Sequence, residues 1–176
     1  MANNVKKYIL TAVILGSISA VAAGAIALTN LVTKDKIAEN EVISFNKGLS
    51  EIFGDGANAT EENIDLSSYP LTKKCYTVRI NDEIVGYAFK SEGSNDYGKI
   101  GIVSGFDVNS LSFISLYLIK NEQSFGPTLV KKYVNPLKED PTKLEDVSCG
   151  ATRGAEVVRN MIKEAGNAAI DNFGKK

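Results

Sequence analysis

Eight residues near the C-terminal end combine phosphate-binding chemistry with room for a bulky group. They read Asp146-Val147-Ser148-Cys149-Gly150-Ala151-Thr152-Arg153. The small residues at 148–151 allow close approach by a large ligand. An amphipathic helical pattern follows at once, so Thr152 falls at or near a helix N-cap, where free amides and the helix dipole favour an anion. Arg153 adds a cation. The residues alone leave two interpretations open, a phosphate site or a capping threonine after a turn.

The segment resembles the flavinylation motif of the FMN-binding domain family, which reads Asp-x-x-Ser/Thr-Gly-Ala-Thr. Asp146, Gly150, Ala151 and Thr152 match that motif at the right spacing, and Cys149 stands at its Ser/Thr position. In that family the last threonine carries FMN through a phosphoester bond, which a separate magnesium-dependent flavin transferase installs from FAD. The resemblance therefore implies that Thr152 is the attachment residue.

Two further stretches extend the resemblance over most of residues 34–176. Ile84–Phe89 with Tyr97–Ile100 is similar to a strand pair and a Gly-Tyr-x-Gly-x-Ile element of the family. Asn121–Gly126 resembles a shortened Glu-Thr-Pro-Gly-Leu-Gly loop of the RnfG proteins, which belong to the Rnf complex. The NqrC proteins of the sodium-pumping NADH–quinone reductase are related and have the same plan. The resemblance implies that FMN contacts come from Asp146, Ser148, Cys149, Gly150, Ala151, Arg153, Glu122 and Ser124.

The function that the resemblance implies is electron transfer by a protein that is not catalytic alone. FMN passes electrons in pairs or singly, which suits a relay. As a protein similar to RnfG, the chain would join other membrane subunits that couple ferredoxin oxidation and NAD⁺ reduction to ion transport. Two alternatives stay open. One is a freestanding extracellular flavin carrier. The other is a flavin-free anchored binding module, in which Thr152 only caps a helix and Cys75 and Cys149 form a disulfide.

The composition narrows what the side chains can do without a cofactor. The 176 residues include no histidine, and the 2 cysteines lack CxxC spacing. Histidine-dependent triads, histidine zinc sites and cysteine-ligated clusters are therefore excluded for this chain alone, and no metal site is predicted. A formal net charge of −1 does not predict a nucleic-acid partner. Gly93–Lys99 matches GxxxxGK, but Ile100 replaces the magnesium-binding Ser or Thr and a strand pattern follows, so a hairpin loop is predicted.

An uncharged run of 26 residues, Tyr8–Thr33, predicts a transmembrane helix, because about 20 apolar residues span a bilayer. A cleavable signal peptide with a cleavage site near 23–27 is the alternative. The two lysines of residues 1–7 place the N-terminus in the cytoplasm and residues 34–176 outside the membrane. Small residues at a spacing of four, which favour close approach of another membrane helix, are Ala12, Gly16, Ala20 and Gly24.

The remaining pattern predicts an α+β domain, an antiparallel sheet flanked by helices and preceded by the single transmembrane helix. Helical spacing covers 34–53 and ends at Gly54 and Gly56. Residues 54–72 are polar and loop-like. Strands are expected over 74–80, 84–90, 99–107 and 112–119, with a tight hairpin at Asn81-Asp82. Prolines make 121–143 irregular, and 154–173 is an amphipathic helix. The predicted parts are a cytoplasmic head (1–7), a membrane helix (8–33) and an extracytoplasmic FMN-binding domain (34–176).

Overall fold

The computed structural model describes residues 2–124, 144 and 152–174, with backbone only for 2–5. Its contacts divide the chain into two units, Met1–Asn40 and Glu41–Lys176. One helix, α1 (Ala2–Phe53), contributes to both units. The predicted helices over 8–33 and 34–53 are therefore continuous, because no glycine or proline breaks the pattern between them.

The first unit is a helix whose apolar side chains face outward. Its large apolar residues are exposed, among them Tyr8 at 75% and Val21 at 73%. Among the described residues, α1 is the helix that is long and apolar enough to cross a membrane. The hydroxyls of Thr29 and Thr33 donate to the carbonyls four residues earlier, at 2.9 and 2.6 Å. Such bonds satisfy polar side chains without water, as a membrane span requires.

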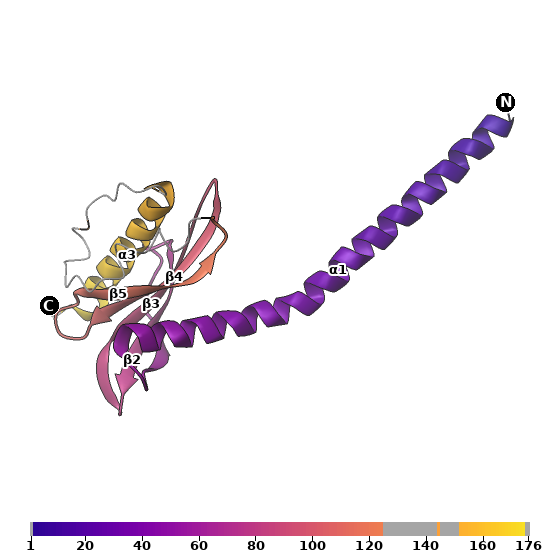
Figure 1. The fold of residues 1–176 in the computed structure, drawn as a ribbon. Helices are drawn as coiled ribbons and strands as arrows, with labels where there is room; N and C mark the ends of the chain where they lie inside the picture. The colour runs from indigo at the N-terminus through magenta and orange to yellow at the C-terminus, as the bar shows by residue number, and fades with distance from the viewer. Residues whose placement is uncertain (1, 125–143, 145–151, 175–176) are drawn as a thin grey trace. The chain divides into compact units, whose positions relative to one another are not determined.

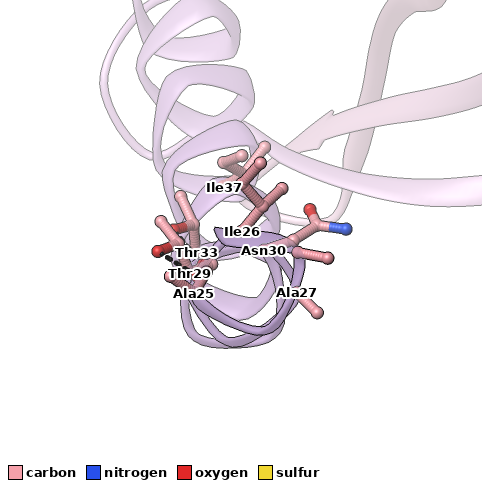
Figure 2. Close-up of a pocket in the computed structure, with 8 residues that line it drawn as sticks. Ala25, Ile26, Ala27, Thr29, Asn30, Thr33 and Ile37 are labelled. Atoms are coloured by element: carbon pink, nitrogen blue, oxygen red, sulfur yellow. Dashed lines mark hydrogen bonds between the residues drawn. The ribbon is translucent and has the colours of Figure 1, made fainter. Parts of the chain in front are cut away.

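A shallow groove on this unit is lined by one stretch of α1, from Ala23 to Ile37. Figure 2 shows Ala25, Thr29 and Thr33 on one side of the helix and Ala27 and Asn30 on the other. Because all of its lining comes from a single helix, the groove is an open surface and not an enclosed site.

The second unit is built on a five-stranded antiparallel sheet in the order β1-β2-β3-β4-β5. The strands are β1 (Asn58–Glu62), β2 (Thr72–Ile80), β3 (Glu83–Asn95), β4 (Gly98–Asp107) and β5 (Phe113–Asn121). Each strand pairs with its neighbour in sequence, so the sheet is a meander with short connections. The predicted hairpin at Asn81-Asp82 is confirmed, with φ of 51° and 67°, the left-handed values that a tight two-residue turn needs.

Helices cover both faces of the sheet. The helix α3 (Thr152–Phe173) lies along one face (Figure 1) and buries Val158, Met161 and Ile162 against Phe89 and other strand residues. On the other face, the end of α1 packs Leu49 and Ile52 against a second cluster of buried strand residues, Val78, Ala88 and Val103. The predicted α+β fold, with a sheet between two helical segments, is confirmed.

The polar pattern of 54–72 predicts a loop, and this is wrong for its middle. Residues 58–62 form β1, which pairs with β2 from Asn58↔Arg79 to Glu62↔Cys75. The stretch lacks apolar alternation because β1 is an edge strand that buries little; Glu62 accepts a hydrogen bond from Thr77 Oγ1 at 2.7 Å. β3 also runs past the expected residue 90 to Asn95, since its ladder with β4 continues to Asn95↔Gly98.

Candidate functional site

One end of the sheet gathers the described residues that the motif singled out. In an antiparallel meander, the start of β2, the end of β3, the start of β4 and the end of β5 lie at the same end. Thr72, Asn95, Gly98 and Asn121 mark those positions. The turn Asp96-Tyr97 joins β3 to β4 there, and Gly98 follows with φ +124°, a conformation that favours glycine. The GxxxxGK match is thus a hairpin that continues as strand β4, as predicted.

Glu122 ties the end of β5 to this hairpin. Its carboxylate Oε2 accepts a hydrogen bond from the Lys99 amide at 3.0 Å, and its own amide donates to the Lys99 carbonyl at 2.9 Å. Lys120 Nζ lies 3.6 Å from Glu122 Oε1. The amide of Lys99 lowers the pKa of Glu122 most, and Lys120 contributes. Glu122 is therefore a carboxylate that orders the hairpin, and Ser124 lies two residues on, in an exposed turn.

Gln123 and Asn95 add a second link between the same two segments. Gln123 Nε2 donates to Asn95 Oδ1 at 2.8 Å and to the Gly98 carbonyl at 3.1 Å. Asn95 Oδ1 also accepts from the Tyr97 amide at 2.9 Å. The amide nitrogen of Asn95, Nδ2, is buried and has no hydrogen-bond partner within the described parts of the chain. Leaving a buried donor unpaired costs free energy.

The first turns of α3 meet the same hairpin. Thr152 is the first residue of α3 and is exposed, and Arg153 Nη1 lies 3.5 Å from Asp96 Oδ2 in the turn. A Cβ placed on Gly93 would lie 2.6 Å from Val157 Cγ1, so only a glycine lets the helix sit this close to β3. Thr152 is thereby held at the end of the sheet where Glu122 lies.

A cavity of about 340 Å³ opens at this end. Three lysines line it, Lys73 from β2, Lys99 from β4 and Lys120 from β5, together with Glu92 from β3. Three positive charges against one negative charge favour an anionic ligand. Gly93, the glycine of β3 that allows α3 to approach closely, also lines the cavity. Val157, which packs on Gly93, lies ~7.5 Å along the helix from Thr152, and no residue of α3 lines the cavity.

Four of the nine predicted site residues are described, and the fold brings them to one end. They are Glu122, Ser124, Thr152 and Arg153. The other five, Asp146, Ser148, Cys149, Gly150 and Ala151, lie outside the described residues. Cys75, the proposed disulfide partner of Cys149, is buried beneath α3, and burial raises its thiol pKa to about 12.

The residues that shape this end from the strands are not among those predicted from the sequence. Lys73, Lys99 and Lys120 are three of 20 basic residues, and nothing in their local pattern distinguishes them. They become neighbours only through strand pairing. The alternation within β4 and β5 could place Lys99 and Lys120 near one sheet edge, but it does not fix the register between the strands.

The comparisons with known proteins concern the helix α1. The family model for the RnfG N-terminal region matches residues 1–52. The N-terminal region of the chain is RnfG-like. The matched range coincides with α1 (Ala2–Phe53) and ends before the sheet and the Thr152 end of the domain. This match supports a subunit of an Rnf-type complex, and α1 is the candidate membrane span among the described residues. No curated protein sequence matches the chain.

Proposed function

We propose that this RnfG-like chain is an electron-transfer subunit that carries FMN covalently on Thr152. The observation that carries the proposal is the motif of residues 146–152, whose last residue opens helix α3 and is exposed. A phosphoester at a helix N-terminus is stabilised by the free amides and the helix dipole. The flavin would be installed by a separate flavin transferase.

Several groups at the same end of the sheet as Thr152 suit an anionic, planar ligand such as FMN. The cavity volume of about 340 Å³ lies within the ~300–1,000 Å³ of small-molecule sites. Its lysines suit an anionic group, and Asn95 Nδ2, which has no partner among the described residues, would be a donor for a carbonyl oxygen or ring nitrogen if the ligand reached it. Arg153 stands one position after the attachment residue, and Glu122 and Gln123 hold the hairpin that faces it.

When bound, FMN supplies the redox chemistry. The roles of the chain are to anchor the cofactor, to orient it and to leave it accessible to neighbouring redox centres. Thr152 would hold the phosphate, and Asp146, Ser148, Cys149, Gly150 and Ala151 would form the loop around it, as the motif implies. We also propose that the N-terminus faces the cytoplasm and that residues 34–176 lie outside, since Lys6 and Lys7 precede the span. The partners would be other membrane subunits of an Rnf-type complex.

Thr152→Ala tests the attachment directly. The full-length chain, produced together with a flavin transferase, should show the mass of FMN less one water and retain flavin fluorescence after denaturation. Thr152→Ala should lose both signals. Ser124→Ala, a hydroxyl at the same end of the sheet, should keep them. Retention of in-gel fluorescence by denatured Thr152→Ala protein would exclude Thr152 as the attachment residue.

A freestanding carrier and a flavin-free module make different predictions. Co-purification with multi-span membrane subunits favours the Rnf-type complex over the freestanding carrier. A native mass without FMN, but lower by two hydrogens, would favour the flavin-free module with a Cys75–Cys149 disulfide.

A further inference from the structure

Among the described residues of the domain, one aromatic side chain is exposed at the end of the sheet where Thr152 lies. Tyr97 is 63% exposed, more than the two other large apolar residues exposed among the described residues after α1, Ile84 at 42% and Ile170 at 41%. Tyr97 stands in the two-residue turn of the β3–β4 hairpin. Such positions are usually taken by Gly, Asn, Asp, Ser or Pro. Turn chemistry therefore does not account for a tyrosine here.

The other described tyrosines of the domain each have a partner. Tyr87 stacks on Phe173 with ring centroids 3.8 Å apart, and Tyr76 meets Phe45 at 4.7 Å. Tyr69 donates its hydroxyl to Asp171, and Tyr117 lies under Lys47 Nζ. No ring pair within the described residues includes Tyr97. The face of this ring is open to a ligand.

The turn also holds the backbone at Tyr97. The Tyr97 amide is held by Asn95 Oδ1, and the preceding residue, Asp96, pairs with Arg153. Arg153 in turn follows Thr152. Tyr97 and Thr152 therefore each stand one residue away from a partner of this ion pair.

We propose that Tyr97 is the platform on which the planar isoalloxazine ring of the Thr152-bound FMN stacks. The inference rests on the proposed function and adds a positioning residue to it. Aromatic rings prefer offset stacks or edge contacts, and such pairs gain free energy beyond burial alone. The hairpin, ordered by Glu122 and Gln123, would hold the ring near the lysine-lined cavity while its other face stays accessible to a redox partner.

Flavin fluorescence reports this contact. An excited flavin takes an electron from a tyrosine or tryptophan ring that it touches, and the electron then returns, so both groups are restored and no light is emitted. Stacked flavin therefore decays with a short lifetime and unstacked flavin with a long one. The ratio of the two amplitudes measures the ratio of stacked to unstacked flavin.

The experiment uses the full-length flavinylated protein and three variants. Tyr97→Leu should lower the stacked-to-unstacked ratio roughly two- to tenfold, as loss of an aromatic pair predicts. Tyr97→Trp should keep the short lifetime, since tryptophan both stacks and quenches. Tyr69→Phe is the matched control. Its partner Asp171 lies nineteen positions beyond Thr152, ~28 Å along α3, so its lifetimes should equal those of the native protein.

The two proposals fail separately. If Tyr97→Leu carries the FMN mass and keeps the native lifetime ratio, Tyr97 is not the platform, while the attachment at Thr152 stands. If the native chain carries no covalent FMN mass, the proposed function is wrong, and the stacking role is wrong with it.

Discussion

A methyl group added at Gly93 should weaken the packing of α3 on β3 at the Thr152 end of the helix. The new Cβ would lie 2.6 Å from Val157 Cγ1 and 3.5 Å from Met161 Sδ, whereas ordinary contact begins at 3.4 Å. Val157 would have to yield by about 0.8 Å. It is β-branched on a helix and has one strongly preferred rotamer, so the helix itself must move. Overpacking of this kind costs ~1–3 kcal/mol. A strand glycine replaced by alanine returns roughly 0.5–1 kcal/mol.

A double-mutant cycle separates the effect of the contact between residues 93 and 157 from the effect of replacing glycine on the backbone. Gly93→Ala should lower the free energy of unfolding by about 1–2 kcal/mol. Val157→Ala removes two partly buried methyl groups and should cost about 1 kcal/mol. The double variant should cost no more than Val157→Ala, because the clashing atom is gone. Urea unfolding of the detergent-solubilised full chain, followed by the fluorescence of its tyrosines, measures all three, since the chain has no tryptophan.

The neighbouring exposed residue provides the control. Ser94→Ala should change the free energy of unfolding by less than about 0.5 kcal/mol. If the effects of Gly93→Ala and Val157→Ala add within about 0.5 kcal/mol, the close approach of β3 and α3 is refuted. Flavin incorporation at Thr152 should fall in Gly93→Ala and recover in the double variant.

Two titrations test hydrogen bonds of the domain, one between β4 and the residue after β5 and one at the C-terminal end of α3. The pKa of Glu122 is lowered below 4.5, chiefly by the Lys99 amide. That bond is therefore formed above pH 4.5 and lost as the pH falls through the lowered pKa. Hydrogen-exchange protection of the Lys99 amide should fall as this bond is lost, and Glu122→Gln should remove the pH dependence. Carboxylates titrate between roughly pH 5 and pH 2. Constant protection of the Lys99 amide in the native protein over that range would contradict the bond. The pKa of Tyr69 is raised to about 12, mainly by its hydrogen bond to Asp171. The stabilisation that this hydrogen bond gives the folded state is complete below pH 10 and is lost as the pH rises through the raised pKa of about 12. Ultraviolet titration should therefore show a late tyrosinate step that Tyr69→Phe lacks. If that step remains in Tyr69→Phe, it belongs to another group.

Local patterns were enough to predict the elements that bury an apolar face. The amphipathic spacing of 154–173 predicts α3, and alternation predicts β2 to β5 within a few residues. Asn81-Asp82 predicts the hairpin because these residues tolerate the left-handed backbone. The edge strand β1 escaped prediction since it buries almost no apolar side chain. Only its ladder with β2, from Asn58↔Arg79 onward, makes it a strand.

The sequence by itself determined the uncharged span, the sheet between helices and the motif that ends in Thr152, because these depend on neighbours along the chain. The tertiary structure decided which distant residues share an end of the sheet. Strand pairing brings Lys73, Lys99 and Lys120 around one cavity, and the close approach at Gly93 sets the start of α3 against the end of β3. The tertiary structure also decides that the Tyr97 side chain is exposed and that its turn contacts the start of α3. Neither property can be seen in the order of the residues.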